Sequence, residues 1–311
     1  MTLPRVSVII CTWNRSHLLE QTLGRLEQIW WPPAGEAELV VVNNASTDRT
    51  DEVARAFAAR LPLRVVVEPA PGASNARNRG IRETTAPLVL FTDDDVLADR
   101  EWIAGFLDAT ERFKSAGVFG GPIEPWFPQA PDPDLVAAFP MLAGGFAGLD
   151  HRRDAGPLPP ALDVYGANMG FRRQVFDRHS FDPRLGPVHD AMSTNEETRL
   201  LDQLRADGIE VVWVPGMRLQ HYVSPERMTL SYLIPYTRGL AQGEVRRGGP
   251  PDGTQLLGVP RWVLREAAEA KIRYYWHWLM RNRRDALSAL RVYTYQAAVA
   301  AECRALRREQ R

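Results

Sequence analysis

Residues 5–12 read RVSVIICT, a run of β-branched and apolar side chains that predicts a buried β-strand. Apolar side chains then recur at helical spacing over residues 16–29, so a helix is expected to follow the strand. The alternation continues with expected strands at 38–42, 63–68 and 88–92 and expected helices at 48–60 and 74–84. This βαβ order indicates a mostly parallel sheet with helices on both faces.

The second half of the chain is less regular. Further expected elements are a helix at 99–115, strands at 117–121 and 209–214, and a helix at 196–207. Asp99 is expected to cap the first of these helices and Gly208 to end the second. In the first half of the chain, Ser46 or Thr47 is expected to cap the helix at 48–60. Residues 122–160 are broken by Pro and Gly and are predicted to form a variable surface region or lid. We therefore predict a catalytic domain over residues 1–228 and a C-terminal helical region over 229–311.

The composition excludes several classes of protein. The chain has 311 residues, with 38 Lys and Arg against 38 Asp and Glu, so its overall charge does not indicate a nucleic-acid-binding protein. Only two cysteines, Cys11 and Cys303, are present, which fits a reducing compartment without a disulfide framework. The N-terminus does not resemble a signal peptide and no apolar stretch reaches the length of a membrane span. A cytoplasmic location is therefore expected, either free or at the inner face of the membrane.

Three adjacent carboxylates, Asp93-Asp94-Asp95, follow the expected strand at 88–92. Each would raise the pKa of its neighbours, so the triplet indicates either a solvated turn or a site for positive charge. Divalent cations such as Mg²⁺ or Mn²⁺ bind carboxylate oxygens together with phosphate oxygens. Polar residues also follow the first two strands, and ligands bind at this edge of parallel sheets, so the three clusters are expected to meet at one site.

The chain carries seven short motifs in a fixed order. They are VSVIICTWNR, VVNNASTD, SNARNRGI, FTDDDV, YGANMGFRRQVF with FDPRLG, NEETRLLDQLRADG and LQHYVSPER. Together they span residues 6–227, and this pattern resembles the family 2 glycosyltransferases, which are inverting enzymes with the GT-A nucleotide-sugar-binding fold. The resemblance implies a Rossmann-like, mostly parallel mixed sheet flanked by helices, followed here by a C-terminal helical extension.

The resemblance also implies roles for individual residues. The implied nucleotide-sugar-binding residues are Thr12, Asn14, Asn43, Arg77, Asp93, Asp94 and Asn168, with Asp48 closing the loop before the next helix. Asn43 occupies a position that is usually Asp in the family, and an amide keeps an acceptor oxygen but loses the charge. Gly166 and Gly170 would allow close backbone approach beside the donor and acceptor, and Arg172 would anchor that loop. The implied metal ligands are Asp93, Asp95 and His221.

Inverting transfer needs a base that removes the proton of the acceptor hydroxyl. The resemblance assigns this role to the Glu196-Glu197 pair, with Glu197 at the base position in place of the commoner Asp. Because Glu is about one methylene longer, the acceptor would approach differently. The alternative is that both residues only favour the N-terminus of a helix through its macrodipole.

The C-terminal region is basic, with twelve Lys and Arg against five Asp and Glu from residue 261 onward. Its apolar stripe consists of Ile272, Tyr275, Trp276, Leu279 and Met280, interleaved with arginines. A basic aromatic helix of this kind can lie on an anionic membrane. The alternative is that the stripe packs on the catalytic domain or on another subunit.

The predicted function is that of an inverting glycosyltransferase that depends on a divalent cation, Mn²⁺ or Mg²⁺. The donor would be a nucleoside-diphosphate sugar of UDP, GDP or dTDP type, and the acceptor a glycan or lipid-linked glycan. Two alternatives are a sugar-phosphate nucleotidyltransferase, although the CTWNRSHLLE loop lacks a glycine-rich phosphate cradle, and a non-catalytic sugar-nucleotide-binding protein.

Overall fold

The computed structural model describes residues 3–185 and 196–309. The chain divides into two compact units, one formed by Met1–Pro125 and Ala147–Tyr222 and the other by Trp126–Phe146 and Val223–Arg311. This division differs from the predicted boundary after residue 228 in two respects, because the second unit already resumes at Val223 and it also includes Trp126–Phe146. Residues 126–146 belong to the second unit, because Leu135, Phe139 and Leu142 are buried in its core.

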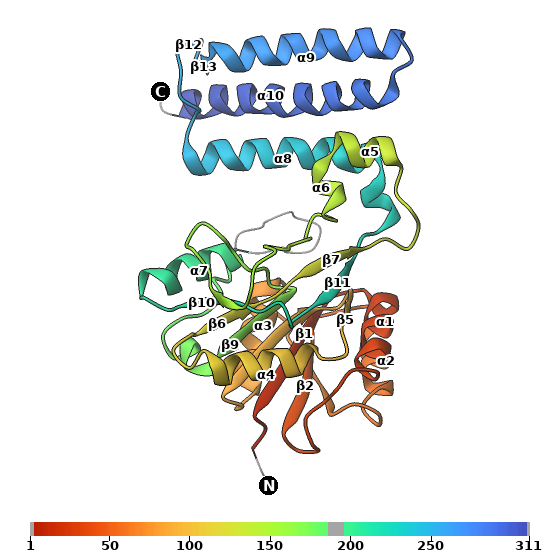
Figure 1. Ribbon diagram of the computed structural model, residues 1–311, viewed down its shortest axis with the longest axis vertical. Helices are drawn as coiled ribbons and strands as arrows, with labels where there is room; N and C mark the ends of the chain where they lie inside the picture. Colours follow the sequence, from red (N-terminus) through yellow and green to blue (C-terminus); the bar gives the residue numbers. More distant parts are fainter. Residues whose placement is uncertain (1–2, 186–195, 310–311) are drawn as a thin grey trace. The chain divides into compact units, whose positions relative to one another are not determined.

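The first unit is built on an eight-stranded mixed sheet within the described residues (Figure 1), with the order β3-β2-β1-β4-β9-β6-β10-β8. The strands are β1 Val6–Thr12, β2 Ala37–Asn43, β3 Leu63–Val67, β4 Leu88–Asp93, β6 Val118–Gly120, β8 Gly156–Pro157, β9 Asn168–Arg172 and β10 Val211–Trp213. The first four pair in parallel, whereas β9 runs antiparallel to both β4 and β6. The predicted mostly parallel mixed sheet is confirmed.

Helices cover both faces of this sheet, as its sequence pattern predicts. They are α1 Ser16–Leu26, α2 Thr50–Ala56, α3 Ala73–Glu83, α4 Trp102–Arg112 and α7 Glu196–Ala206. Alternate residues of β1 enter different cores, because successive side chains of a strand point to opposite faces. Val8 and Ile10 pack with side chains of α1, α2 and α4, and Ile9 packs with side chains of α3 and α7.

A second, three-stranded sheet lies beside the acidic triplet. It has the order β5-β11-β7, formed by Val96–Ala98, Leu219–Tyr222 and Ile123–Trp126. The antiparallel register of β11 and β5 places His221 opposite Val96. The chain therefore returns a histidine to the carboxyl end of β4 more than a hundred residues after the triplet.

The caps predicted for the N-termini of two helices are wrong. Helix α2 begins at Thr50, whose N–H donates to Asp48 at 3.0 Å, while the Ser46 hydroxyl and the Thr47 N–H bond to Asn14 in the preceding loop. Helix α4 begins at Trp102 without a side-chain cap, so Asp99 contributes only its backbone carbonyl. At the start of α2 and of α4, hydrogen bonds within or between loops thus take the place of the expected side-chain cap.

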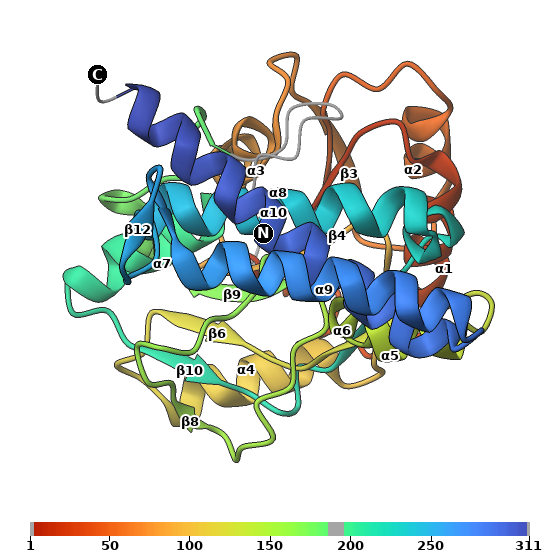
Figure 2. The same cartoon turned by 90° about the horizontal axis from the view of Figure 1, so that it is seen from above.

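The second unit is helical, as predicted for residues 261 onward. Its elements are α5 Pro133–Ala138, α6 Pro140–Ala143, the 3₁₀ turn Pro225–Met228, α8 Leu230–Gly248, the hairpin β12 Gln255–Leu256 and β13 Val259–Pro260, α9 Arg261–Leu279 and α10 Arg283–Glu309. Helix α10 packs against both α8 and α9, with the hairpin at the N-terminal end of α9 (Figures 1 and 2). No helix within the described residues has both the length and the apolar character needed to cross a bilayer.

Asp132 joins the short helix α5 to α10 inside the second unit. Its carboxylate accepts hydrogen bonds from the N–H groups of Asp134 and Leu135 at 2.9 and 3.4 Å, and from Arg283 at 2.6 and 2.9 Å. The hydrogen bonds from Arg283, assisted by those backbone N–H groups, lower the pKa of Asp132 to about 2. The residue therefore acts as a helix cap and as an ion-pair partner.

We expect Asp132→Ala to lower the free energy of unfolding by about 1 kcal/mol at neutral pH, because a charged cap is lost. Since the folded state depresses this pKa, the contribution is present above the ordinary value of 3.8 and is lost as the pH falls toward 2. Urea denaturation of wild type and variant should therefore give curves that converge in acid. Asp134→Ala, which removes an Arg283 contact but no cap, is the control, and an equal loss in both variants would contradict the assignment.

Candidate active site

Three strands bring their polar ends to one edge of the sheet. The parallel register places Thr12 beside Asn43 and Cys11 beside Asp93. The Thr12 hydroxyl then donates to Asp94 at 2.6 Å in the buried interior. The expected meeting of the strand-end clusters is thus observed, although Thr12 is itself buried and its hydroxyl hydrogen is used by Asp94.

Asn14 and Asp48 fasten the loops after β1 and β2 to each other. Asn14 has a left-handed backbone with φ 51°, and its side-chain oxygen accepts the N–H groups of Thr47 and Asp48 at 2.7 and 3.3 Å. Asp48 accepts the N–H of Ser16 at 3.1 Å in return. These bonds hold the two loops side by side, so Asp48 closes the loop as predicted.

Asn43 and Asn44 shape the turn after β2. The side-chain oxygen of Asn43 accepts the N–H of Ser46 at 2.9 Å, which uses one lone pair of the acceptor predicted for a base. Asn44 donates to the carbonyl groups of Glu68 and Ala70 and accepts the N–H of Gly72 at 2.8 Å. Both amides are buried, and Asn44 ties the turn to the segment that leads into α3.

The three aspartates lie in different surroundings. Asp94 is buried and accepts from Thr12 and from Arg15 at 3.1 Å, and burial raises its pKa to about 7. Arg15 also donates to Asp95 at 2.9 Å. The sequence reasoning did not assign Arg15, although its place directly after TWN at the end of β1 puts a cation beside the triplet.

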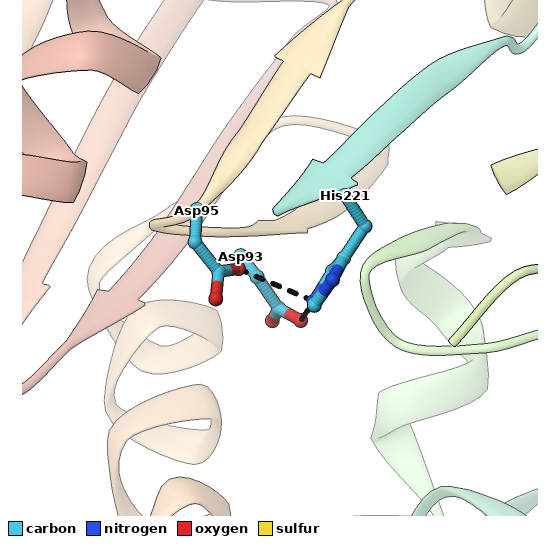
Figure 3. Close-up of side chains that lie close together, drawn as sticks. All are labelled: Asp93, Asp95 and His221. Carbon is cyan, nitrogen blue, oxygen red and sulfur yellow. Dashed lines mark ion pairs between the residues drawn. The ribbon is translucent and has the colours of Figure 1, made fainter. Parts of the chain in front are cut away.

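Asp93, Asp95 and His221 form a cluster that could hold a metal ion (Figure 3). One ligand atom from each residue lies within 4.8 Å of the others. The His221 Nε2 is 3.3 Å from Asp95 Oδ1 and 3.8 Å from Asp93 Oδ2. Asp95 Oδ1 and His221 Nδ1 are buried and make no hydrogen bond within the described residues.

This arrangement fits a divalent cation. Buried polar atoms without partners are costly, and a carboxylate pair that faces an imidazole supplies the oxygen and nitrogen ligands that such ions take in proteins. The structure brings together the three residues that the sequence predicted as ligands. They come from the end of β4, the following turn and β11.

A second group of charges surrounds Arg77 of α3. Its guanidinium is buried and donates to Glu196 at 2.8 Å and to Glu197 at 2.7 Å, and it lies 4.0 Å from Asp93 Oδ1. The expectation that this arginine lies near the donor pocket is compatible with its position, and the alternative of an exposed helical arginine is wrong. Arg77 thereby connects the metal cluster to the predicted base.

Glu197 is oriented from two sides. Its second oxygen accepts the N–H of Gly166 at 2.7 Å, and a Cβ placed on Gly166 would lie 1.9 Å from the other oxygen. Burial raises the pKa of Glu197, although the Arg77 charge opposes that shift. The result is a carboxylate of fixed orientation and raised basicity, which a residue that only favours a helix N-terminus would not need.

Comparison with known proteins identifies the family. The model for "Glycosyl transferase family 2" matches residues 7–180, which is more than half of the chain. The chain belongs to this family. Residues 7–180 contain the acidic triplet, Arg77 and Gly166, whereas Glu196, Glu197 and His221 lie beyond the match.

Several curated relatives are glycosyltransferases. The chain is 37% identical over 142 residues to validoxylamine A glucosyltransferase of Streptomyces hygroscopicus subsp. limoneus, covering 44% of this chain and 31% of that protein. It is 25% identical over 250 residues to glucosyl-dolichyl phosphate glucuronosyltransferase of Haloferax volcanii, covering 78% of this chain and 76% of that protein. The match thus spans about a third of the first relative's length.

Two solved structures align with nearly the whole chain. TarS 1–349 of S. aureus in complex with UDP-GlcNAc aligns with a TM-score of 0.56 and 15% identity over 99% of this chain and 92% of that one. The mannosyltransferase PcManGT from Pyrobaculum calidifontis, in complex with GDP-Man and Mn²⁺, aligns with a TM-score of 0.54 and 20% identity, over 100% of this chain and 80% of that one. These similarities establish the GT-A fold.

The sequence predicts that Asn168 and Gly170 lie beside the donor and acceptor, but both make packing or hydrogen-bond contacts inside the protein. Asn168, expected to bind the donor, is fully buried, accepts from Trp102 at 2.9 Å and donates to two backbone carbonyls. It lies on β9, inside the sheet, so its amide is occupied by the protein. A Cβ on Gly170 would meet the Phe106 ring at 2.3 Å, so that glycine serves packing.

Arg172 anchors the loop as expected, through the carbonyls of Ala116 and Thr110 at 2.9 and 2.5 Å. Two of the motifs extend beyond the described residues. Gly186 of FDPRLG and Asn195 of NEET lie outside them.

We expect Arg77→Met to lower the free energy of unfolding by about 3–5 kcal/mol, because it leaves the buried Glu196 and the partly buried Glu197 without their cationic partner. Chemical denaturation measures the loss, and adding Glu196→Gln and Glu197→Gln to the variant should recover part of it. Arg79→Met is the matched control, since Arg79 lies on the same helix and pairs with Glu83 at 2.8 Å at a more exposed position. Arg79→Met should lower the free energy of unfolding by about 0.5 kcal/mol or less. An equal decrease in both variants would contradict the assignment of a larger stabilising role to the ion pairs of Arg77.

Proposed function

We propose that this chain is an inverting, cation-dependent glycosyltransferase that uses Glu197 as its general base. The observation that carries the proposal is the Arg77 guanidinium, which bonds Glu197 on one side and lies 4.0 Å from Asp93 of the metal cluster on the other. One buried residue thus links a candidate base to a candidate cation site. An inverting transfer needs both, because the acceptor is deprotonated while the leaving diphosphate departs.

Glu197 has the features of a base. Each of its oxygens accepts one hydrogen bond from the protein, from Arg77 or from Gly166, and retains a lone pair for an incoming hydroxyl proton. The Arg77 charge favours the ionised form and burial increases its proton affinity. The side chain can therefore take the acceptor proton without reorienting.

Asp93, Asp95 and His221 would hold the cation, which when bound neutralises negative charge on the departing nucleoside diphosphate. Arg15 supports this cluster by fixing the carboxylates of Asp94 and Asp95. Asn14 and Asp48 hold the two loops at the strand ends, where the nucleotide is proposed to bind. We propose Mn²⁺ or Mg²⁺ as the ion.

The comparisons support the proposed substrates. Similar structures contain UDP-GlcNAc, UDP or GDP-Man, so a nucleoside-diphosphate sugar is the proposed donor. A relative that aligns over most of both chains is named for a dolichyl phosphate substrate, which supports a lipid-linked acceptor. Family membership favours sugar transfer over the predicted nucleotidyltransferase alternative. Peripheral contact with the inner face of a membrane belongs to the same proposal, since a lipid-linked acceptor lies at such a surface.

We expect Glu197→Gln to reduce sugar transfer by about a hundredfold or more, because the amide cannot take the acceptor proton and its single oxygen can accept only one of the two hydrogen bonds from Arg77 and Gly166. Donor binding should remain close to that of the wild type. Transfer assays with single-turnover kinetics and calorimetric donor titration separate the two effects. Asp202→Asn, on the exposed side of the same helix, is the control, and near-normal turnover by Glu197→Gln would remove the base assignment.

We expect one of UDP, GDP, dTDP and CDP to bind with a requirement for Mn²⁺, and Asp95→Asn to abolish that requirement together with most of the affinity. The physical reason is that Asp95 offers a buried oxygen that makes no hydrogen bond within the described part of the chain. Calorimetric titration of each diphosphate, with and without the ion, measures this. Glu101→Gln, an exposed change nearby, should leave binding intact, and tight binding that ignores both the metal and Asp95 would contradict the cation site.

A further inference from the structure

The last two turns of α9 carry an apolar face that neither neighbouring helix covers. Ile272, Tyr275, Trp276 and Leu279 are 57 to 70% exposed. Their spacing of i, i+3, i+4 and i+7 places all four on one side of the helix. Trp278 and Met280 extend the exposed apolar surface at the helix end, where they are 67 and 60% exposed. We call these six residues the α9 stripe.

Packing within the second unit does not require this stripe. The other side of α9 contributes Val263 and Ala270 to the unit, where both are fully buried against neighbouring elements. Val263 packs with side chains of α10, which also contacts α8, so the stripe lies on the side of α9 opposite the one that packs against α10. An exposed group of large apolar side chains of this kind marks an interaction surface.

The charged residues of the chain segment that carries the stripe are all basic. Between Glu269 and Asp285 the chain has five basic residues and no acidic one; they are Lys271, Arg273, Arg281, Arg283 and Arg284. At 100° per residue, Lys271 and Arg273 fall on opposite flanks of the stripe. Arg273, Arg281 and Arg284 are exposed and make no ion pair within the described residues, whereas Arg283 is held by Asp132 and Asp134. The surface is therefore apolar in the middle and cationic at its edges.

We propose that the α9 stripe is a binding surface for anionic phospholipid membranes. Tryptophan and tyrosine favour the boundary between headgroups and acyl chains, and flanking Lys and Arg reach phosphate groups while their aliphatic parts stay in the apolar layer. The helix would lie in the plane of the membrane with the stripe inserted. A two-fold contact between copies of the chain would bring the two basic clusters together, which disfavours a second copy as the occupant.

The surface extends over two helical turns only. Toward the N-terminus of α9 the same side becomes polar, with an ion pair between Arg265 and Glu269 at 3.8 Å. A short apolar face with basic flanks gives reversible binding that depends on lipid charge, in contrast to the insertion of a spanning helix. This surface is distinct from the transfer chemistry, so a negative result would remove the proposed membrane contact and leave the proposed transfer activity standing.

The test is co-sedimentation of the full chain with vesicles of phosphatidylcholine, with and without added phosphatidylglycerol. We expect binding to the anionic vesicles that weakens between roughly 0.1 M and roughly 1 M salt. The double variant Trp276→Ser/Leu279→Ser should bind at least about tenfold more weakly, because two inserted side chains are lost. Lys271→Gln and Arg273→Gln should each lower the affinity for anionic vesicles about fivefold.

Two matched controls separate the stripe from general surface effects. Leu256 and Leu257 of the hairpin at the other end of α9 are 50 and 73% exposed, so Leu256→Ser/Leu257→Ser removes comparable apolar surface and should leave binding unchanged. Arg304→Gln and Arg308→Gln remove exposed charge at the end of α10 and should also have little effect. Thermal melts of every variant should match the wild type, because the changed side chains are exposed.

Three outcomes would overturn the proposal. Equal vesicle binding by the Trp276→Ser/Leu279→Ser variant would show that the stripe is not the contact. Equal binding to neutral and anionic vesicles would remove the role of the basic flanks. A wild-type dimer that the stripe variant converts to a monomer in light scattering, without vesicle binding, would assign the stripe to a second copy of the chain.

Discussion

Five carboxyl groups gather at the carboxyl edge of the sheet in the first unit, and two arginines hold them there. Arg15 bonds Asp94 and Asp95, and Arg77 bonds Glu196 and Glu197 and lies near Asp93. Two cations cannot neutralise five anions, and burial raises the pKa of Asp93, of Asp94 and of Glu197 accordingly. This edge of the sheet therefore carries net negative charge when its carboxyl groups are ionised, and protons or a bound cation can neutralise it.

The fold explains why this charge can be concentrated without unfolding the site. The parallel strands β1, β2 and β4 end together, so their loops share hydrogen bonds that no single loop could make. The Asn14 amide and the Asp48 carboxylate fasten two of these loops. Because both sheet faces are buried beneath helices, the strand ends are fixed and the carboxylates cannot separate to relieve their repulsion. A rigid edge of this kind is suited to holding ligands for an ion.

Sequence reasoning found the parts of the site that are local and missed those that depend on distant contacts. The alternation of strands and helices is a local pattern, and the triplet stands at the end of a recognisable strand, so the sheet and Asp93 and Asp95 were predictable. His221 was found only through the family resemblance. Arg15 was missed because its partners lie about 80 residues away, and Asn168 was misplaced because its three partners come from separate segments. Contacts between residues distant in the sequence also explain why residues 126–146 belong to the second unit, where their apolar side chains are buried.

The two units distribute apolar surface in opposite ways, and this difference bears on function. In the first unit most large apolar side chains of the strands and helices are buried, and two buried polar atoms of the charged edge, Asp95 Oδ1 and His221 Nδ1, make no hydrogen bond within the described residues. In the second unit the α9 stripe leaves three large aromatic side chains and three aliphatic ones in contact with water. Exposed apolar area adds nothing to the stability of the folded chain, so its presence on one short face needs another explanation. Its basic flanks indicate a negatively charged partner, which the nearly neutral chain as a whole does not suggest.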